Sequence, residues 1–588
     1  MYKLGIRQTG DKPVTGTTIM MEEPHTNTKL ESAGSNLNTP NLHMLKKNDL
    51  GIILHPQPED NPNDPLNWPM LRKDLCFLII GFQTFIGGGQ TPILAAGFRQ
   101  LLGEFDKTVA KISYLVGAFM LALGLGSVFA SPTAILYGKR LVYLLGIVIF
   151  LIGAVVCACL ANYGGLMAGR ILTGFGASPT ESLALASLSD LYFQHERAYR
   201  TGLYTLLLLG GKNILPLLSS LIFQHLDRHW LYWIQAMFLG VNLLLTFLFV
   251  PETYWDRTNV KIGPETVTTG PQIHENLRDT ALVNTGDDSR ARQLLTVPGG
   301  RKSDDCASSG RSSSPHTTSS GTSMPKLFTK RLHLISGRHS ADKWWMVAMR
   351  PLFLYCYPPV LYGAIVYSLA VVWLIVISEV LAEIFQAEGY GYLAQTVGLF
   401  YLSPFVGGIL GSLAAGILGD RVTLYVVKVN HGVYEPEFRL FMLIPLTIVT
   451  CIGLMGYGWL SHVQDPWIAP VLFFGCLSFG SLMASTTAIT YTVDCYKMFA
   501  AEALVSFNLA KNVIGFVFSL FNNDAFLSLD GKRLFVIYGC SQLFVSLLGI
   551  VMYVYGKVSR AWTDDRNMLR CLYHADRLET EKKTDTAI

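Results

Sequence analysis

The sequence predicts an all-α membrane protein in which twelve transmembrane helices form two pseudo-symmetric six-helix bundles. Twelve apolar stretches each approach the ~20 residues that a helix needs to cross a bilayer. They fall into two groups of six on either side of a polar segment, 256–355. Half of the residues are hydrophobic and only 15% are charged, whereas soluble domains carry about a quarter charged residues. Lipid therefore contacts much of this chain.

The expected spans are 75–97, 113–131, 140–161, 165–190, 203–223 and 230–250, then 360–384, 393–418, 440–460, 467–493, 503–522 and 534–556. They divide the chain into a disordered cytoplasmic tail (1–70), a first bundle (71–255), a disordered cytoplasmic linker (256–355), a second bundle (356–557) and a cytoplasmic C-terminal tail (558–588). The linker contains a serine-rich, threonine-rich and glycine-rich run, 308–323, that cannot bury enough apolar surface to fold. Segment 326–338 alternates basic and apolar residues, so it is either a helix on the inner leaflet or plain linker.

Lysine and arginine in the short loops predict the orientation, because cytoplasmic loops carry an excess of them. One set of loops holds Arg72, Lys73, Lys139, Arg140, Arg197, Arg200, Arg421, Lys428, Arg439 and Lys497, and the other holds Arg99, Lys107, Lys111, Arg228, Lys532 and Arg533. The richer set lies on the side of both termini. We therefore expect a multi-pass protein with both termini in the cytoplasm.

Composition and motifs exclude several functions. A net charge of +4 over 588 residues does not predict a nucleic-acid surface. Most of the ten cysteines lie inside spans without a CxxC pair, so we expect neither a disulfide framework nor a metal site. Run Gly210–Lys212 lacks the upstream glycine and the hydroxyl residue of a phosphate loop. We expect no catalytic residues and no cofactor, with a proton gradient as the energy source.

The two halves repeat each other in register, which for a chain of six plus six spans indicates duplicated bundles. Asp190 and Asp494 each precede a tyrosine at position +2, at the inner ends of the fourth and tenth spans. The fifth and eleventh spans contain Lys212-Asn213 and Lys511-Asn512. Small residues recur at steps of four in the second and eighth spans and predict close helix packing: Ala118, Ala122, Gly126 and Ala130, then Gly407, Gly411, Ala415 and Gly419.

Five further motifs complete the pattern: Asn63–Pro69, Arg170 with Gly174 and Gly176, Asp190 through Glu196-Arg197, Pro251-Glu252-Thr253, and Glu435–Leu440. With them the chain resembles, over residues 60 to 557, the fungal drug:proton antiporter branch of the major facilitator superfamily. It departs from the family at Ile135, where an acidic residue is usual. Gly210, Gly211 and Pro216 match the antiporter motif only in part, so the motif does not define the direction of transport.

The resemblance implies proton-coupled export of a drug or secondary metabolite by alternating access. Related members import organic cations such as polyamines, so uptake of a nutrient or organic cation is the alternative, and a membrane sensor of the same fold is a second one. The resemblance also favours the plasma membrane over the vacuolar membrane. The expected partners are a small-molecule substrate and the lipid bilayer, and we expect a monomer. The gating candidates are Lys139, Arg140, Asp190, Asp420, Arg421 and Asp494.

Ionisable residues inside the spans are the candidates for mechanism, because a charge at mid-bilayer costs at least about 2.5 kcal/mol. Arg170 and Glu181 lie eleven residues apart on one span, so both would project from one face about 16 Å apart and line a cavity. Glu181 is the candidate proton carrier, or else a structural carboxylate held by a neighbouring helix. Arg170 is a candidate for binding an anion, or else a brace between helices.

Lys212 and Lys511 come from spans related by the repeat, so they could bind an anionic or zwitterionic substrate from opposite sides of a cavity. The alternative is that Lys511 braces Asp494 or Glu502 while Lys212 pairs with Glu181. Asn213, Asn508 and Asn512 are further substrate-binding candidates, because an unsatisfied amide in hydrocarbon is costly. Near the outer end of the seventh span, Glu379 and Glu383 form either a vestibule for cations or an ordinary helix interface.

Overall fold

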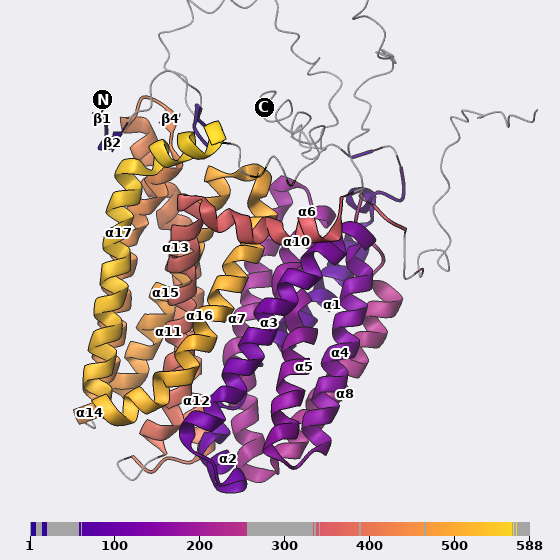
Figure 1. Cartoon of the computed structure of the whole chain (residues 1–588), viewed down its shortest axis with the longest axis vertical. Helices are drawn as coiled ribbons and strands as arrows, with labels where there is room; N and C mark the ends of the chain where they lie inside the picture. The colour runs from indigo at the N-terminus through magenta and orange to yellow at the C-terminus, as the bar shows by residue number, and fades with distance from the viewer. Residues whose placement is uncertain are drawn as a thin grey trace, which may run out of the picture.

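The computed structural model describes residues 2–7, 14–19, 58–59, 61–255, 333, 337–339, 342–386, 390–463, 466–566, 569 and 572. Long helices dominate these residues and run side by side in Figure 1, with each half of the chain forming one side of the molecule. Most of the predicted tail 1–70, the predicted linker 256–355 and the C-terminal end lie outside the described residues.

The first half contains α1 (Met70–Gly88), α2 (Phe98–Phe105), α3 (Val109–Tyr137), α4 (Lys139–Cys159), α5 (Tyr163–Ser182), α6 (Ala184–Leu191), α7 (Gln194–His225) and α8 (Arg228–Phe249), with short 3-10 helices η2 (Pro65–Asn67) and η3 (Ala95–Gly97). The second half contains α10 (Trp344–Phe353), α11 (Pro358–Phe385), α12 (Ala394–Leu399), α13 (Leu402–Val429), α14 (Leu443–Val463), α15 (Ile468–Cys495), α16 (Ala500–Leu529) and α17 (Gly531–Arg566). Its 3-10 helices are η4 (Leu354–Cys356), η5 (Pro436–Met442) and η6 (Lys497–Phe499).

Ten helices in the described part of the chain are long and apolar enough to cross a membrane. They correspond to ten of the twelve expected spans. The other two, 75–97 and 165–190, coincide with α1 and with α5 followed by α6, which pack inside the first half. Charged residues at the start of α1 and the many glycines of α5 lower the hydropathy of these two segments. The all-helical membrane fold is confirmed, and the total of twelve spans stays a prediction.

The repeat is visible in the packing. In the first half α5 packs against α3 and α4, and in the second half α15 packs against α13 and α14 in the same way. A methyl group placed on Gly126 of α3 would lie 2.7 Å from Ser178 Oγ on α5. One placed on Gly411 of α13 would lie 2.3 Å from the Phe479 carbonyl oxygen on α15. The predicted small faces therefore allow the expected close approach, although Gly419 faces open space.

Two segments differ from the prediction. The predicted linker contains the helix α10, which crosses the ends of α3 and α16 instead of running along the bundle (Figure 1). Segment 326–338 lies mostly outside the described residues. In the predicted tail, β1 (Tyr2–Lys3) pairs with β2 (Ile6–Arg7), and β3 (Thr18–Ile19) pairs with β4 (Val433–Tyr434) of the second half. Strands β3 and β4 pair across the fold, which no local pattern signals, whereas β1 and β2 form a local hairpin.

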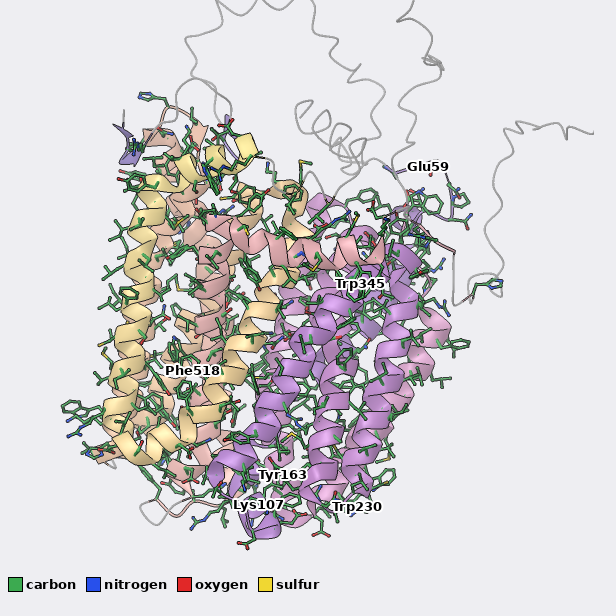
Figure 2. The ribbon with its side chains drawn as sticks, viewed as in Figure 1. Glu59, Lys107, Tyr163, Trp230, Trp345 and Phe518 are labelled. Atoms are coloured by element: carbon green, nitrogen blue, oxygen red, sulfur yellow. The ribbon has the colours of Figure 1, made fainter. Side chains whose placement is uncertain are left out.

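Exposed tryptophans mark the two ends of the bundle. Trp230, at the start of α8, is 51% exposed, and Trp345, on α10, is 71% exposed. Figure 2 places them toward opposite ends of the helices, with Lys107 near Trp230. Tryptophan is enriched where a membrane meets water, and α10 lies at the same end of the helices as the first and last described residues.

Candidate functional site

A central cavity of about 420 Å³ lies between the two halves. Its wall combines α5 and α7 of the first half with α11, α15 and α16 of the second. Apolar side chains such as Leu208, Ile375 and Phe507 form much of the surface. The lining reaches Thr201 and Thr490, near the end of the bundle that carries α6 and α10 (Figure 1). The cavity is of the size that small-molecule sites occupy.

A distortion at the end of α5 positions Glu181. Pro179 lies inside this helix and has no N–H, so the Phe175 carbonyl loses its helical donor, and the Ser178 hydroxyl donates to it at 2.8 Å. Thr180 and Ser182 also donate to carbonyls of their own helix. The predicted single span 165–190 is divided at Leu183 into α5 and α6, and Glu181 projects into the cavity beside this break.

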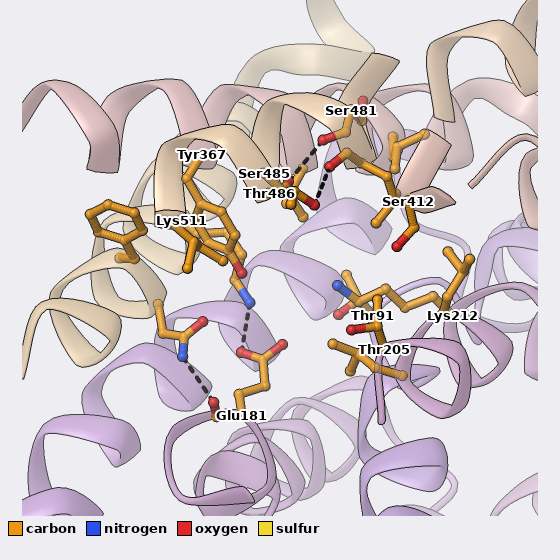
Figure 3. Close-up of a pocket in the computed structure, with 18 of the residues that line it drawn as sticks. Thr91, Glu181, Thr205, Lys212, Tyr367, Ser412, Ser481, Ser485, Thr486 and Lys511 are labelled. Atoms are coloured by element: carbon orange, nitrogen blue, oxygen red, sulfur yellow. Dashed lines mark hydrogen bonds and ion pairs between the residues drawn. The ribbon is translucent and has the colours of Figure 1, made fainter. Parts of the chain in front are cut away.

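Glu181 and Lys511 form a buried ion pair across the interface of the two halves. Lys511 Nζ on α16 lies 2.6 Å from Glu181 Oε2 on α5, and the side chains of Lys511 and Glu181 are only 4% and 8% exposed. Asn508 Nδ2 donates to the Glu181 backbone carbonyl at 3.1 Å. Asn512 lies beside the same carboxylate. Figure 3 shows this pair at the wall of the cavity. Three predicted residues, Glu181, Asn508 and Lys511, therefore meet directly.

Lys212 lines the same cavity. Among the described residues the Lys212 amino group forms no hydrogen bond and no ion pair. It lies close enough to Glu181 and Lys511 to interact electrostatically with both charges. Figure 3 shows its side chain extending into the cavity beside Thr91 and Thr205. The alternative pairing of Lys212 with Glu181, and of Lys511 with Asp494 or Glu502, is wrong, because Glu181 of α5 pairs with Lys511 of α16 instead.

Asn213 also lines the cavity, and its Nδ2 donates to the Leu209 carbonyl of its own helix at 3.0 Å. Arg170, in contrast, does not line the cavity. It is fully buried and donates from Nη2 to the Gln90 carbonyl at 2.8 Å, with its guanidinium 4.5 Å from the Phe119 ring. The expectation that Arg170 and Glu181 line one cavity is therefore corrected. Arg170 braces α5 against α3 and the residues that follow α1.

The gating candidates meet partners at the end that carries α6 and α10. Lys139 Nζ lies 2.6 Å from Asp190 Oδ2 in the first half. In the second half Asp494 pairs with Arg439, whose Nη1 also lies 3.8 Å from the exposed Asp420. In each half the aspartate thus pairs with a basic residue near the start of the preceding span. The sequence reasoning missed Arg439 as the partner, although Glu435–Leu440 contains it.

The remaining two basic candidates behave differently. Arg140 donates from Nη2 to the Phe247 carbonyl at the end of α8, and for Arg421 the described residues supply no ion pair. Glu252, which was not a candidate, accepts from the backbone N–H groups of Lys139 and Arg140 at 3.0 and 3.1 Å, and from those of Thr253 and Tyr254. Its carboxylate therefore closes the N-terminus of α4.

A buried charge cluster holds the same end of the second half. Arg560 Nη2 lies 2.8 Å from Glu437 and 2.9 Å from Glu435, and Lys557 Nζ lies 2.6 Å from Glu435. The Thr17 hydroxyl donates to Glu435 at 2.8 Å. Burial by itself would raise the pKa of Glu435, but the hydrogen bond from Lys557 and the charge of Arg560 together hold that pKa below its usual value.

The opposite end of the molecule is closed by contacts between the halves. Gln386 Nε2 donates to the Ala96 carbonyl at 2.9 Å, and Arg99 donates to the Gln386 carbonyl. Asn523 and Ser113 are also hydrogen-bonded. Nearby, Glu379 is 2% exposed and accepts from Asn522 Nδ2 at 3.2 Å. This burial favours a helix interface over a cation vestibule for Glu379.

Comparisons with known proteins agree with this architecture. The profile of the Major Facilitator Superfamily matches residues 75–520. Protein HOL1 of Saccharomyces cerevisiae is 25% identical over 544 residues, covering 88% of this chain and 92% of that protein. The efflux pump radE of Floropilus chiversii is 24% identical over 465 residues, covering 79% and 76%. The solved xylose transporter XylE of E. coli has the same fold, with a TM-score of 0.52 at 12% identity, covering 81% of this chain and 98% of that one.

Proposed function

Since the chain belongs to the Major Facilitator Superfamily, a multi-pass membrane transporter family, we propose that it moves a small organic molecule across its membrane by alternating access coupled to protons. The observation that carries this proposal is the Glu181–Lys511 ion pair, which links the two halves at the wall of the central cavity. In this class the two bundles rock around a site near the membrane midplane. An ion pair between them is therefore placed to respond to that motion.

Glu181 is the proposed proton carrier. When its carboxylate takes up a proton, the attraction that holds the Lys511 ammonium disappears, because a neutral acid no longer compensates that charge. The two halves then lose one contact that favours the observed arrangement. Loss of the proton restores the pair. Protonation of one carboxyl thereby changes the balance between two arrangements of the halves.

The charge pairs at the cavity's open end brace each half internally. Lys139–Asp190 and Arg439–Asp494 lie within one half each, so they are able to persist while the halves move relative to one another. At the opposite end the contacts of Gln386 and Arg99 join the halves directly. We propose that these latter contacts break when the cavity opens on that side. With the termini in the cytoplasm, the present arrangement faces the cytoplasm.

Export and uptake are both candidates for the direction of transport. Export is supported by the similarity to the radE protein, which is named an efflux pump, and by a cavity that reaches the proposed cytoplasmic side. Uptake together with protons is supported by Lys212, which forms no ion pair with the described residues, since a positively charged cavity suits a cargo that travels with a proton rather than against it. For either direction the plasma membrane is the proposed location and a monomer the proposed working unit.

Purified protein reconstituted into vesicles tests the proposal. An imposed pH gradient should drive a mixture of cell metabolites across the membrane, as measured by mass spectrometry of the vesicle interior. Glu181→Gln should abolish the dependence on the gradient while the protein still inserts. Wild-type proton-driven flux in Glu181→Gln would remove this residue from the mechanism. Binding of metabolites without any accumulation would instead support a sensor of the same fold.

A further inference from the structure

The charges on the cavity wall do not cancel. Among the described residues that line it, the groups carrying a full charge are Glu181, Lys212 and Lys511. With both lysines charged, their sum is +1, since one carboxylate faces two ammonium groups. The Lys511 charge is already compensated by Glu181 at 2.6 Å. The surplus therefore belongs to Lys212.

Lys212 is available to a ligand from the cavity. Its amino group has no protein partner among the described residues, and an ammonium in a largely apolar environment gains substantially from a counter-ion. In Figure 3 the side chain of Lys212 extends into the cavity toward the side on which Glu181 and Lys511 lie. Thr91 and Thr205 stand beside it, and neither neutralises its charge.

The wall on α15 presents hydrogen-bond acceptors. Ser485, Thr486 and Thr490 donate their hydroxyl hydrogens to carbonyls of their own helix at 2.8 to 2.9 Å. Their oxygen lone pairs remain free to accept from a ligand. Figure 3 shows Ser485 and Thr486 on the wall across the cavity from Lys212. Apolar side chains, including Leu208 and Ile375, fill much of the remaining surface.

We propose that the cargo is an organic monoanion, with a carboxylate or similar group that pairs with Lys212, an apolar body, and a hydrogen-bond donor that faces α15. This inference deepens the proposed transport function and rests on it. The volume of about 420 Å³ suits a molecule of one or two rings. A polycation is disfavoured, because it would add like charge to a cavity that already has an excess.

The proton and the anion should assist each other. Glu181 is faced by Lys511 of α16, Lys212 and Tyr204 of α7, and Tyr367 of α11. Protonating Glu181 releases Lys511 and changes the sum of charges from +1 to +2, which attracts an anion more strongly. This sign of coupling belongs to symport, so an anionic cargo favours uptake over export.

Equilibrium binding to the purified full-length protein tests this inference without any gradient. The probes are 1-naphthaleneacetate and its uncharged amide, which have nearly the same shape, with binding followed by tryptophan fluorescence. The acetate should bind more tightly than the amide by more than about tenfold, the value of a charge-assisted hydrogen bond. Lys212→Met should remove this difference and leave the amide unaffected. Lys212→Arg should keep it, and Lys107→Met, an exposed lysine outside the cavity, is the matched control.

Equal binding of the acetate and the amide, or no binding of the acetate, would overturn the inference, as would an equal loss of both probes in Lys212→Met. Loss of an unpaired charge should leave the folded state intact, which a thermal unfolding curve checks. Glu181→Gln imitates the protonated carboxyl, so at neutral pH it should bind the acetate more tightly than the wild type does, and equal or weaker binding would overturn the co-binding of a proton. Vesicles that show no proton-driven flux while Lys212-dependent binding persists would contradict the transport proposal alone.

Discussion

Removing Glu181 and removing Lys511 should destabilise the protein by different amounts, because the charge that remains in the cavity differs between the two variants. Glu181→Gln leaves the Lys511 ammonium 4% exposed with no counter-charge, and removing one partner of a buried pair costs about 3 to 5 kcal/mol. Lys511→Met leaves the Glu181 carboxylate, which keeps the nearby charge of Lys212 and can also take up a proton. We therefore expect the second variant to lose less, about 1.5 to 3 kcal/mol.

The double variant Glu181→Gln, Lys511→Met removes both charges of the pair. It leaves no buried Lys511 ammonium without a counter-charge, so it should be more stable than Glu181→Gln alone. The free energy of unfolding in mixed micelles, measured for all four proteins, yields the coupling between the two residues. We expect a coupling of at least about 1.5 kcal/mol. Strictly additive losses would show that the two side chains do not interact in the membrane protein. A larger loss for Lys511→Met than for Glu181→Gln would refute the role assigned to Lys212.

Three further predictions concern the scaffold around the cavity. Gly411→Leu places side-chain atoms against the backbone of α15 and should lower the free energy of unfolding by about 3 kcal/mol or more, whereas Gly416→Leu, which meets open space, should change it little. Glu252→Gln replaces a charged acceptor of several backbone N–H groups and should cost about 1 to 2 kcal/mol, and an unchanged unfolding curve would contradict its role at α4. Because the pKa of Glu435 is lower in the folded protein, its stabilising contribution is present above the unfolded pKa and disappears as the pH falls through the folded one. The unfolding temperatures of wild type and Glu435→Gln should therefore converge in acid, and a constant difference would count against this assignment.

Local patterns predicted the helices well because each span must satisfy its own backbone hydrogen bonds and present apolar side chains to lipid. They were less accurate where a distant partner decides the outcome. The strand Thr18–Ile19 exists because Val433–Tyr434 lies across the fold. Helix α10 is only ten residues long, and it packs against α3 and α16. A helix this short lacks the long apolar run by which the spans were predicted.

The candidate site shows the same division. Glu181, Lys511, Lys212, Asn508 and Asn512 could be predicted as mechanistic residues, because a polar group inside a span is costly and is rarely without a partner or a cavity. The group that each of these residues contacts could not be predicted from the sequence. The sequence permits Lys212 and Lys511 to pair with several carboxylates, and only the packing of α5 against α16 shows that Lys511 holds Glu181.

The amino-acid sequence by itself determined that this chain is a membrane protein of two repeated bundles with a few ionisable groups in its interior, because hydropathy and spacing are properties of neighbouring residues. Only the tertiary structure decided that Arg170 braces helices away from the cavity, that Glu181 holds Lys511 across the interface, and that Lys212 forms no ion pair with the residues the structure describes. The physical reason is that an ion pair depends on a few ångströms between atoms of different helices. The rotation and bending of those helices are set by the packing of the whole bundle.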